Sequence, residues 1–520
     1  MMNLTNGLQR SAFLFPDRVA TIFGERRRSW KDVHERVTRL AGAMVRRGIK
    51  PGDRVASVAV NSDRFFELYF AVAWAGAVIV PGNFRWSAPE HVYALNDSGA
   101  KLVFLDGQFT GMAGRLLEEC PSLEAAVYMD DGQAPDGLLD FEQLIGQSDP
   151  IEDRCGHGSE LCGLFYTGGT TGRSKGVMLS HDSLIGNYMC RNLTVPRTEE
   201  QIYIHSAPMF HLADAAAVYG LTFTGGTHVI ISSFTPENFV KAVSAERCTD
   251  ATLVPSMLGM LQEYLTANGG DLSSITSLVY GASAISDALV RQVMELFPNA
   301  SLTQAYGQTE LSPCATLLTP EHHRAALEGK PWLRSAGQPM CGMQIRIVDE
   351  NMTPLPFGAV GEITVSGPGV MLGYWNQPEL TAGTLVDGWV RTGDAGYMDD
   401  EGFVYVVDRV KDMIISGGEN VYSAEVENAL SSHSAIQECA VIGVPDEKWG
   451  ERVHAIVRLK SGESVTAEEL SAHCKYAIAG YKCPRSIEFR KEPLPLSAQG
   501  KILKVELRKL FWQDTERNIG

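Results

Sequence analysis

One segment rich in glycine and threonine, at positions 166–176, stands out for the chemistry that its residue types allow. Its sequence, YTGGTTGRSKG, holds four glycines, three threonines and one lysine. Glycines let the backbone approach a ligand closely, hydroxyls donate hydrogen bonds and the lysine adds positive charge, so the segment is typical of a polyphosphate-binding loop. It is not a Walker A loop, because no Gly-Lys-Ser/Thr triplet has the required spacing; a surface loop without a ligand is the alternative. The candidate phosphate-binding residues are Thr167, Gly168, Gly169, Thr170, Thr171, Gly172 and Lys175.

A second group of candidate residues follows two short apolar runs in the middle of the chain. Segment 306–310, YGQTE, combines an aromatic ring, a glycine, a hydroxyl and a carboxylate. The oxygens of Thr309 and Glu310 are ligands that a hard cation such as Mg²⁺ prefers, so both are candidate metal ligands. An ordinary turn is the alternative for either short segment taken alone. The candidate residues of this group are Gly281, Ala282, Ser283, Tyr306, Gly307, Thr309 and Glu310.

The last quarter of the chain adds single charged residues and glycines. Asp394 ends the segment RTGD, Val406 follows twelve residues later, and Asp408-Arg409 begins two residues after Val406. Gly418 lies in the run KDMIISGGEN, and Lys501 ends PLSAQGK. For a single Asp or Arg the alternative is a surface ion pair of little energetic value, and for a lone Gly-Lys it is a solvated turn.

The order of these motifs resembles that of the adenylate-forming superfamily, which includes acyl-CoA synthetases, firefly luciferase and the adenylation domains of non-ribosomal peptide synthetases. The resemblance extends from Thr167 to Lys501 and so covers most of the chain. The chain departs from the family pattern at Gly168, where relatives carry Ser, and at Ser174, where they carry Pro. One phosphate-binding hydroxyl of the family is therefore missing from the loop.

The resemblance implies an adenosine site. In relatives, the residue that matches Tyr306 lies against adenine, and the one that matches Val406 packs against the other face. Segment 281–283 matches the loop beside adenine. Asp394 matches the acid that binds the ribose hydroxyls, and Arg409 matches an arginine that also contacts the ribose.

The resemblance also implies roles in the reaction. Thr309 matches a residue that contacts the α-phosphate, and Glu310 matches one that holds Mg²⁺. Lys501 matches the lysine that bridges the carboxylate of the acid and the α-phosphate. Gly418 matches a residue that lines the pantetheine tunnel, and Asp408 matches the hinge between two domains, expected at residues 1–408 and 409–520.

The implied activity is that of an AMP-forming acyl-CoA synthetase. A carboxylic acid and ATP give acyl-AMP and pyrophosphate, and acyl-AMP and coenzyme A then give acyl-CoA and AMP, with Mg²⁺ as the cation. Two alternatives stay open at this point: an adenylate-forming enzyme that does not use coenzyme A, such as a luciferase-like oxygenase, and a non-catalytic nucleotide-binding relative. The motif residues Thr309, Glu310, Asp394, Arg409 and Lys501 are all present, which argues against the second.

Segment 209–214, MFHLAD, matches the start of the acid pocket in relatives. His211 stands where amino-acid-activating domains carry Asp, which disfavours an α-amino acid as substrate, although Asp214 is close by. We include His211 among the candidate active-site residues, as a gate or packing residue. Small residues follow, from Ala213 to Gly220, and leave room for a medium- or long-chain fatty acid or an aryl, cinnamate-type acid.

The composition limits the partners of this chain. It has 520 residues with a formal net charge of −17, which argues against nucleic-acid binding. Its ten cysteines show no metal-ligand spacing, and neither a secretory signal nor a membrane-spanning run is evident. We therefore expect a cytoplasmic protein, as a monomer or a homodimer, whose partners are a carboxylic acid, ATP and coenzyme A.

The elements that must position these residues follow an alternating pattern. A helix is expected from the capping pair Ser29 and Asp32 to Gly48, and apolar runs on either side predict parallel strands. The candidate loops each follow an expected strand, at 161–166, 278–280 and 301–305, so they are expected to converge on one crevice. The fold class expected is α/β, with parallel βαβ-type sheets, a β-rich subdomain after residue 340 and a small mobile α+β domain at the C-terminus.

Overall fold

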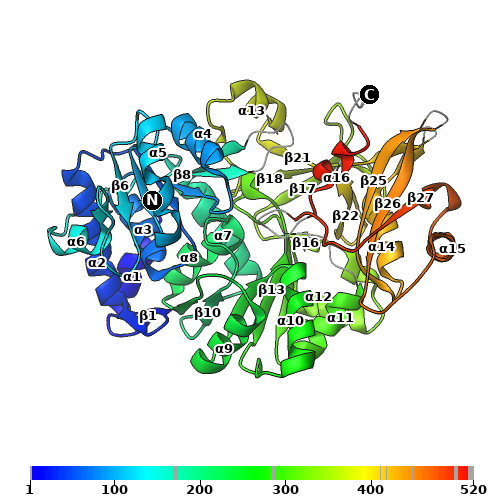
Figure 1. The fold of residues 1–520 in the computed structure, drawn as a ribbon, viewed down its shortest axis with the longest axis horizontal. Helices are drawn as coiled ribbons and strands as arrows, with labels where there is room; N and C mark the ends of the chain where they lie inside the picture. The colour runs from blue at the N-terminus through cyan, green and yellow to red at the C-terminus, as the bar shows by residue number, and fades with distance from the viewer. Residues whose placement is uncertain are drawn as a thin grey trace.

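The computed structural model describes residues 3–167, 174–282, 287–409, 412–416, 419–446, 449–496 and 502–512. Two large sheets and their helices form the N-terminal part of the chain, and a smaller unit, orange to red in Figure 1, follows the strands of a third sheet. The expected α/β class, the β-rich subdomain and the small C-terminal α+β unit are all confirmed.

The first large sheet has eight strands in the order β19-β9-β8-β4-β3-β5-β6-β7. The strands from β8 to β7 pair in parallel, whereas β9 pairs antiparallel with both β8 and β19. The strands span Arg54–Val58 (β3), Val78–Gly82 (β4), Leu102–Leu105 (β5), Ala125–Tyr128 (β6), Leu139–Asp140 (β7), Leu161–Thr167 (β8), Lys175–Ser180 (β9) and Gly373–Tyr374 (β19).

The second large sheet has nine strands in the order β16-β15-β14-β13-β12-β10-β11-β1-β2. Its six central strands, β14 to β1, are parallel, and β15, β16 and β2 are antiparallel edges. The strands span Val19–Phe23 (β1), Arg26–Ser29 (β2), Ile202–His205 (β10), Thr227–Ile230 (β11), Asp250–Leu253 (β12), Ser277–Gly281 (β13), Ser301–Tyr306 (β14), Thr316–Leu318 (β15) and Gln338–Pro339 (β16).

Helices cover these sheets, and the second helix shows why the sequence forms them. The Ser29 side chain caps its start in a capping box with Asp32, and Val33, Val37 and Met44 lie on its buried face. No helix in the described ranges is both long and apolar enough to cross a membrane. The helices are Thr5–Leu14 (α1), Trp30–Arg46 (α2), Asp63–Trp74 (α3), Ala88–Ser98 (α4), Ala113–Glu119 (α5), Phe141–Gly146 (α6), His181–Thr194 (α7), Leu212–Thr224 (α8), Pro236–Glu246 (α9), Pro255–Asn268 (α10), Asp287–Leu296 (α11), Pro320–Leu327 (α12) and Pro378–Thr384 (α13), with 3₁₀ turns at Gly107–Met112, Thr309–Leu311 and Pro331–Arg334.

The rest of the chain forms two smaller sheets, which are antiparallel except for the parallel pair of β26 and β27. The β-rich subdomain is a five-stranded sheet, and the C-terminal unit packs its helices on a second five-stranded sheet with its own apolar core. The first consists of Gln344–Val348 (β17), Gly361–Ser366 (β18), Leu385–Val386 (β20), Trp389–Met398 (β21) and Val404–Arg409 (β22). The second consists of Ile414–Ser416 (β23), Glu419–Val421 (β24), Ile436–Asp446 (β25), Gly450–Leu459 (β26) and Ser486–Arg490 (β27), with helices Ser423–Ser431 (α14), Ala467–Ala477 (α15) and Lys504–Lys509 (α16) and a 3₁₀ turn at Gly480–Lys482.

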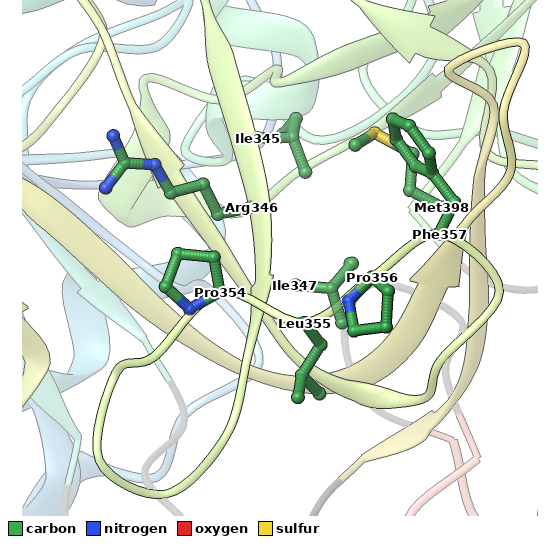
Figure 2. A pocket seen from close by; sticks show the side chains of 8 residues that line it. All are labelled: Ile345, Arg346, Ile347, Pro354, Leu355, Pro356, Phe357 and Met398. Carbon is green, nitrogen blue, oxygen red and sulfur yellow. The ribbon is translucent and has the colours of Figure 1, made fainter.

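A small apolar hollow of about 140 Å³ lies in the β-rich subdomain, where the loop at 354–357 packs over β17. Figure 2 shows Ile345 and Ile347 of β17 on one side of it and Phe357 and Met398 on the other. None of the predicted site residues lines it. The hollow is therefore a packing feature of this subdomain.

Buried charges join β2, α2 and α3. The Glu67 carboxylate is fully buried, and its Oε1 lies 2.8 Å from Arg36 Nε and 3.1 Å from Arg28 Nη1. Both arginines are themselves mostly buried. The carboxylate and the two guanidinium groups therefore stabilise one another in place of water. Burial raises the pKa of Glu67, and the two arginines oppose that shift.

We expect Glu67→Ala to destabilise the large domain by about 3–5 kcal/mol, because the change removes the buried carboxylate that Arg28 and Arg36 share and leaves only their second partners, Asp63 and Glu142. Thermal unfolding followed by calorimetry measures the effect. Glu35→Ala is the matched control: Glu35 pairs with Arg39 in the same helix but is 55% exposed, so its loss should cost less than about 1 kcal/mol. Equal shifts for the two variants would contradict the assignment.

Candidate active site

The two large sheets meet at a contact between Lys175, Tyr374 and Glu310. Lys175 Nζ lies 5.3 Å from the centre of the Tyr374 ring, and the Tyr374 hydroxyl donates a 2.8 Å hydrogen bond to Glu310 Oε1. Thr167 pairs with Lys175 across β8 and β9, so both ends of the loop at 168–173 are held here. The structure thus brings Thr167, Lys175 and Glu310 together, as the sequence predicted.

Glu310 has the features of a carboxylate that can hold a cation. Glu310 is only 9% exposed, and none of the described residues forms a salt bridge with its carboxylate. Thr309 precedes it at the start of a 3₁₀ turn. A buried carboxylate that lacks a cationic side chain beside it fits a hard cation with oxygen ligands.

Tyr306 and Asp394 form a second contact of the site. The Tyr306 hydroxyl donates to Asp394 Oδ2 at 2.8 Å, and Asp394 is nearly buried. Glu362 of β18 fixes the segment before Asp394, since Glu362 accepts a hydrogen bond from the Gly393 amide and pairs with Arg391 at 2.6 Å. The carboxylate of Asp394 therefore has a fixed position beside an aromatic ring.

Two further predicted residues lie on the neighbouring strand, β22. Arg409 pairs in register with Asp394, and Val406 pairs with Gly396. Val406 keeps 37% of its surface exposed, which is unusual for an apolar side chain in a sheet interior. An exposed apolar side chain next to Asp394 suits the face of a flat ring.

Backbone geometry explains the small residues beside this contact. A side chain at Gly281 would place its Cβ 2.2 Å from the Ala305 carbonyl oxygen, so β13 and β14 can approach only with glycine there. Ala282 follows with φ of +67°, a left-handed conformation that is uncommon for alanine. At Gly307 a Cβ would lie 2.2 Å from the Pro313 carbonyl oxygen. The loops after β13 and β14 are thus tightly packed.

Asp408 links the large domain to the C-terminal unit. Its Oδ2 accepts hydrogen bonds from the Ser423 amide at 2.5 Å and the Ser423 hydroxyl at 2.7 Å. Lys504 donates to the same hydroxyl and pairs with Glu427 at 2.7 Å. Burial acts to lower the pKa of Lys504, but the carboxylates of Glu427 and Asp408 more than offset it, and the pKa is raised.

Several predicted residues lie outside the described part of the chain. They are Gly168, Gly169, Thr170, Thr171, Gly172, Ser283, Gly418 and Lys501. For Arg409 the structure describes the backbone only.

His211 and Asp214 differ in their surroundings. His211 lies directly before α8, and its ring contacts that of Phe210 at 5.1 Å. Asp214 is fully buried, and its carboxylate lies 2.6 Å from His205 Nδ1 and accepts from the Tyr203 hydroxyl at 3.3 Å. Asp214 therefore does not face a substrate, which removes the one residue that had kept an α-amino acid open.

The Asp214 contact continues as a buried chain that the sequence did not predict. His205 Nε2 lies 2.9 Å from His228 Nδ1, and His228 Nε2 lies 3.2 Å from the Thr222 hydroxyl. Because that hydroxyl donates to the Val218 carbonyl, it accepts from His228, which in turn accepts from His205. Burial lowers the pKa of His228 well below its usual range, so it stays neutral. His205 and Asp214 then share one proton.

The face of the nine-stranded sheet that carries Tyr203 and His205 is incompletely covered. Thr252, Val279 and Ala305 are partly exposed although they lie on central strands, whereas the opposite face packs against α9, α10 and α11. Ala213 and Ala216 of α8 are also partly exposed. These small and medium residues leave room between sheet and helix for an apolar part of a substrate.

The sequence-based volume estimate needs one correction. It counted Ala215, Ala217 and Gly220 as residues that leave room, but all three are buried. The space beside Gly220 is filled by the ring of Tyr188, which would lie 2.5 Å from a Cβ at that position. Of the five small residues counted, only Ala213 and Ala216 are partly exposed.

Comparisons with known proteins identify the family of this chain. Residues 8–375 match the family model of AMP-binding enzymes, and residues 425–501 match the AMP-binding enzyme C-terminal domain. The chain is 38% identical to a feruloyl-CoA synthase of Amycolatopsis sp, over 96% of this chain and 98% of the relative. It is 34% identical to a long-chain-fatty-acid–CoA ligase of Thermus thermophilus, over 98% and 96%.

Solved structures give the same result. The o-succinylbenzoate CoA synthetase of Bacillus subtilis, in complex with its acyl-adenylate intermediate, superposes with a TM-score of 0.84 at 29% identity, covering 99% of this chain and 98% of that one. The anthranilate CoA ligase AuaEII, in complex with anthranoyl-AMP, superposes with a TM-score of 0.90 at 25% identity, covering 98% and 97%. The chain belongs to the AMP-binding enzyme family. Within it, the chain is an AMP-forming acyl-CoA synthetase, an acid–thiol ligase that uses ATP, Mg²⁺ and coenzyme A.

We expect Asp214→Asn to lower the unfolding temperature without changing which acids the enzyme prefers. The substitution removes the carboxylate that shares a proton with buried His205, a loss of about 3–5 kcal/mol. Calorimetry and initial rates with several acids measure the two effects, and Glu200→Gln, at a side chain that is 79% exposed, is the control. An unchanged unfolding temperature with an altered preference would make Asp214 a substrate contact.

Proposed function

We propose that the contact of Lys175, Tyr374 and Glu310 is the catalytic centre for acyl-adenylate formation. The contact supports this because it holds a cation and a buried carboxylate where the ends of the Gly/Thr-rich loop meet the YGQTE segment. In this proposal Lys175 and Thr167 bind the phosphates of ATP, and Thr309 binds the α-phosphate. Glu310 with Thr309 holds Mg²⁺, which when bound neutralises charge on the phosphates.

The charges explain why the site needs these groups. A carboxylate is a poor nucleophile towards ATP, because both are anions. Lys175 attracts the phosphates, hydroxyl and amide donors stabilise charge that develops as pyrophosphate leaves, and Lys501 bridges the acid and the α-phosphate. Tyr306 and Val406 hold adenine, with segment 281–283 beside it, and Asp394 and Arg409 hold the ribose. His211 acts as a gate or packing residue beside the acid.

We propose that the chain divides at the hinge residue Asp408, into domains 1–408 and 409–520. The small domain presents Lys501 for adenylation and the loop with Gly418 for attack by the thiol of coenzyme A. Lys501 and the thiol need the same side of the acyl group, so the small domain must turn between the two steps. The contact of Asp408 with Ser423 supports this proposal, because one dihedral change there moves the whole unit.

The substrate class proposed is an aryl or a medium- to long-chain acid. The partly exposed residues Thr252, Val279 and Ala213 support it, since they leave an apolar space beyond the YGQTE segment. Relatives named as feruloyl-CoA synthase and long-chain-fatty-acid–CoA ligase fit the same class. We infer a cytoplasmic location from the ten free cysteines and the substrates ATP and coenzyme A.

A panel of acids mixed with the protein, ATP and Mg²⁺, with and without coenzyme A, tests the function. We expect AMP release with aryl or longer acids, and thioester only when coenzyme A is present. Light emission would support a luciferase-like enzyme instead. No AMP release with any acid of the panel, with ATP left intact, would support a non-catalytic relative, so ATP consumption is measured alongside.

Tyr374→Phe tests the catalytic centre itself. The substitution keeps the ring beside Lys175 but removes the hydrogen bond to Glu310, so we expect kcat/KM for MgATP to fall about tenfold. Tyr476→Phe is the control, since Tyr476 is 96% exposed on α15. Equal kinetics for both variants and the unchanged protein would contradict a role for this contact.

A further inference from the structure

Three buried hydrogen-bond donors, two on α7 and one shortly after it, have no acceptor among the described residues. They are the Tyr188 hydroxyl, Arg191 Nη2 and Arg197 Nε. Arg191 is only 9% exposed, and its one hydrogen bond runs from Nη1 to the Val195 carbonyl oxygen at 2.8 Å. Neither arginine forms a salt bridge with any residue that the structure describes.

Asp250 does not form a salt bridge with either of these two cations. Its charge acts on Arg191 electrostatically, and its oxygens accept hydrogen bonds from Gln201 and from the Thr249 hydroxyl, each at 2.7 Å. Burial, and then the charge of Arg197, lowers the pKa of Arg191 to about 9. A buried, unpaired charge is costly, and proteins seldom keep one without a ligand or a function.

The position of α7 places these donors beside the proposed substrate space. Asn187, one helical turn before Arg191, donates to the carbonyl oxygens of Leu311 at 2.8 Å and Cys314 at 2.6 Å, directly after Glu310 in the chain. Both arginine charges act on the Cys314 thiol. Tyr188, on the same side of α7, packs against Gly220 of α8.

The register of the sheet shows how far the donors lie from the reacting end. Arg197 lies over the ring of Tyr203, 5.3 Å from its centre, and Tyr203 is paired through Asp250 with Ser277 at the start of β13. Gly281, at the other end of β13, is beside the proposed site of adenylation. Gly281 lies four residues along β13 from Ser277, a distance of about 13 Å. The partly exposed pair Thr252 and Val279 lies between these two ends of the strand.

We propose that Tyr188, Arg191 and Arg197 form a distal subsite that binds an anionic oxygen at the end of the acid remote from the reacting carboxyl. This proposal rests on the proposed function, because it places the acid along the sheet face that starts at Gly281. All three groups offer N–H or O–H donors, and two are cations. The favoured substrate therefore carries a second carboxylate, and a phenol oxygen at the same place binds less strongly.

A matched series of acids long enough to span about 13 Å tests the subsite: 4-phenylcinnamate whose outer ring bears hydrogen, methyl, hydroxyl or carboxylate in the para position. We expect kcat/KM to be at least about tenfold higher for the para-carboxylate than for the para-methyl acid, with the phenol between them. Arg191→Gln and Arg197→Gln should each remove most of that preference, by lowering kcat/KM for the para-carboxylate acid towards that for the para-methyl acid. Arg247→Gln, at an exposed arginine side chain, is the control.

Thermal unfolding of the ligand-free protein separates a binding role from a structural one. Arg191→Met should raise the unfolding temperature, because it removes a buried unpaired charge. A lower unfolding temperature would give Arg191 a structural role and overturn the subsite, as would equal kcat/KM values across the series in the unchanged protein. If cinnamate and fatty acids all fail to release AMP, the proposed function fails; activity without a para preference overturns the subsite alone.

Discussion

The site depends on a contact between two sheets that share no strand. β9 and β19 belong to the eight-stranded sheet and β14 to the nine-stranded one, and the hydroxyl of Tyr374 on β19 joins them by its bond to Glu310. Lys175 lies beside the same ring. A shared apolar core already joins the two sheets, and this contact fixes Glu310 beside Lys175 within that arrangement. The ring also keeps lysine and glutamate from pairing directly, so both charges are left for ligands.

The local parts of this arrangement could be predicted from the sequence. The helix from Ser29 and the strands before the three Gly-bearing loops follow from capping and apolar periodicity, and they are confirmed. The partners across the fold could not be predicted. Tyr374 lies 64 residues from Glu310, and its run GYW has no pattern that marks a bridge. Local patterns determine elements, whereas such contacts depend on how the elements pack.

The same limit applies to charge. The structure shows two kinds of buried charge. Around Glu67 each cation has a carboxylate, so the group is neutral and structural. Around Arg191 the donors have no acceptor, although the chain has an excess of carboxylates. Since the sequence shows only that an Arg is present, its pairing becomes visible only in the folded protein. An unpaired cation in an acidic protein argues for a ligand.

Paired charges also connect Asp408, the proposed hinge residue, with the residues that follow Lys501. The ends of the segment before Lys501 are held by a bridge between Leu496 and Ile502, and Lys504 follows within one turn. Lys504 contacts Ser423, which is bound by Asp408, so the hinge carboxylate and the base of the segment share one hydrogen-bonded network. If the small unit turns about Asp408, as proposed above, Glu427 keeps Lys504 paired within that unit, and the bonds from Asp408 to Ser423 are the ones that the rotation has to release.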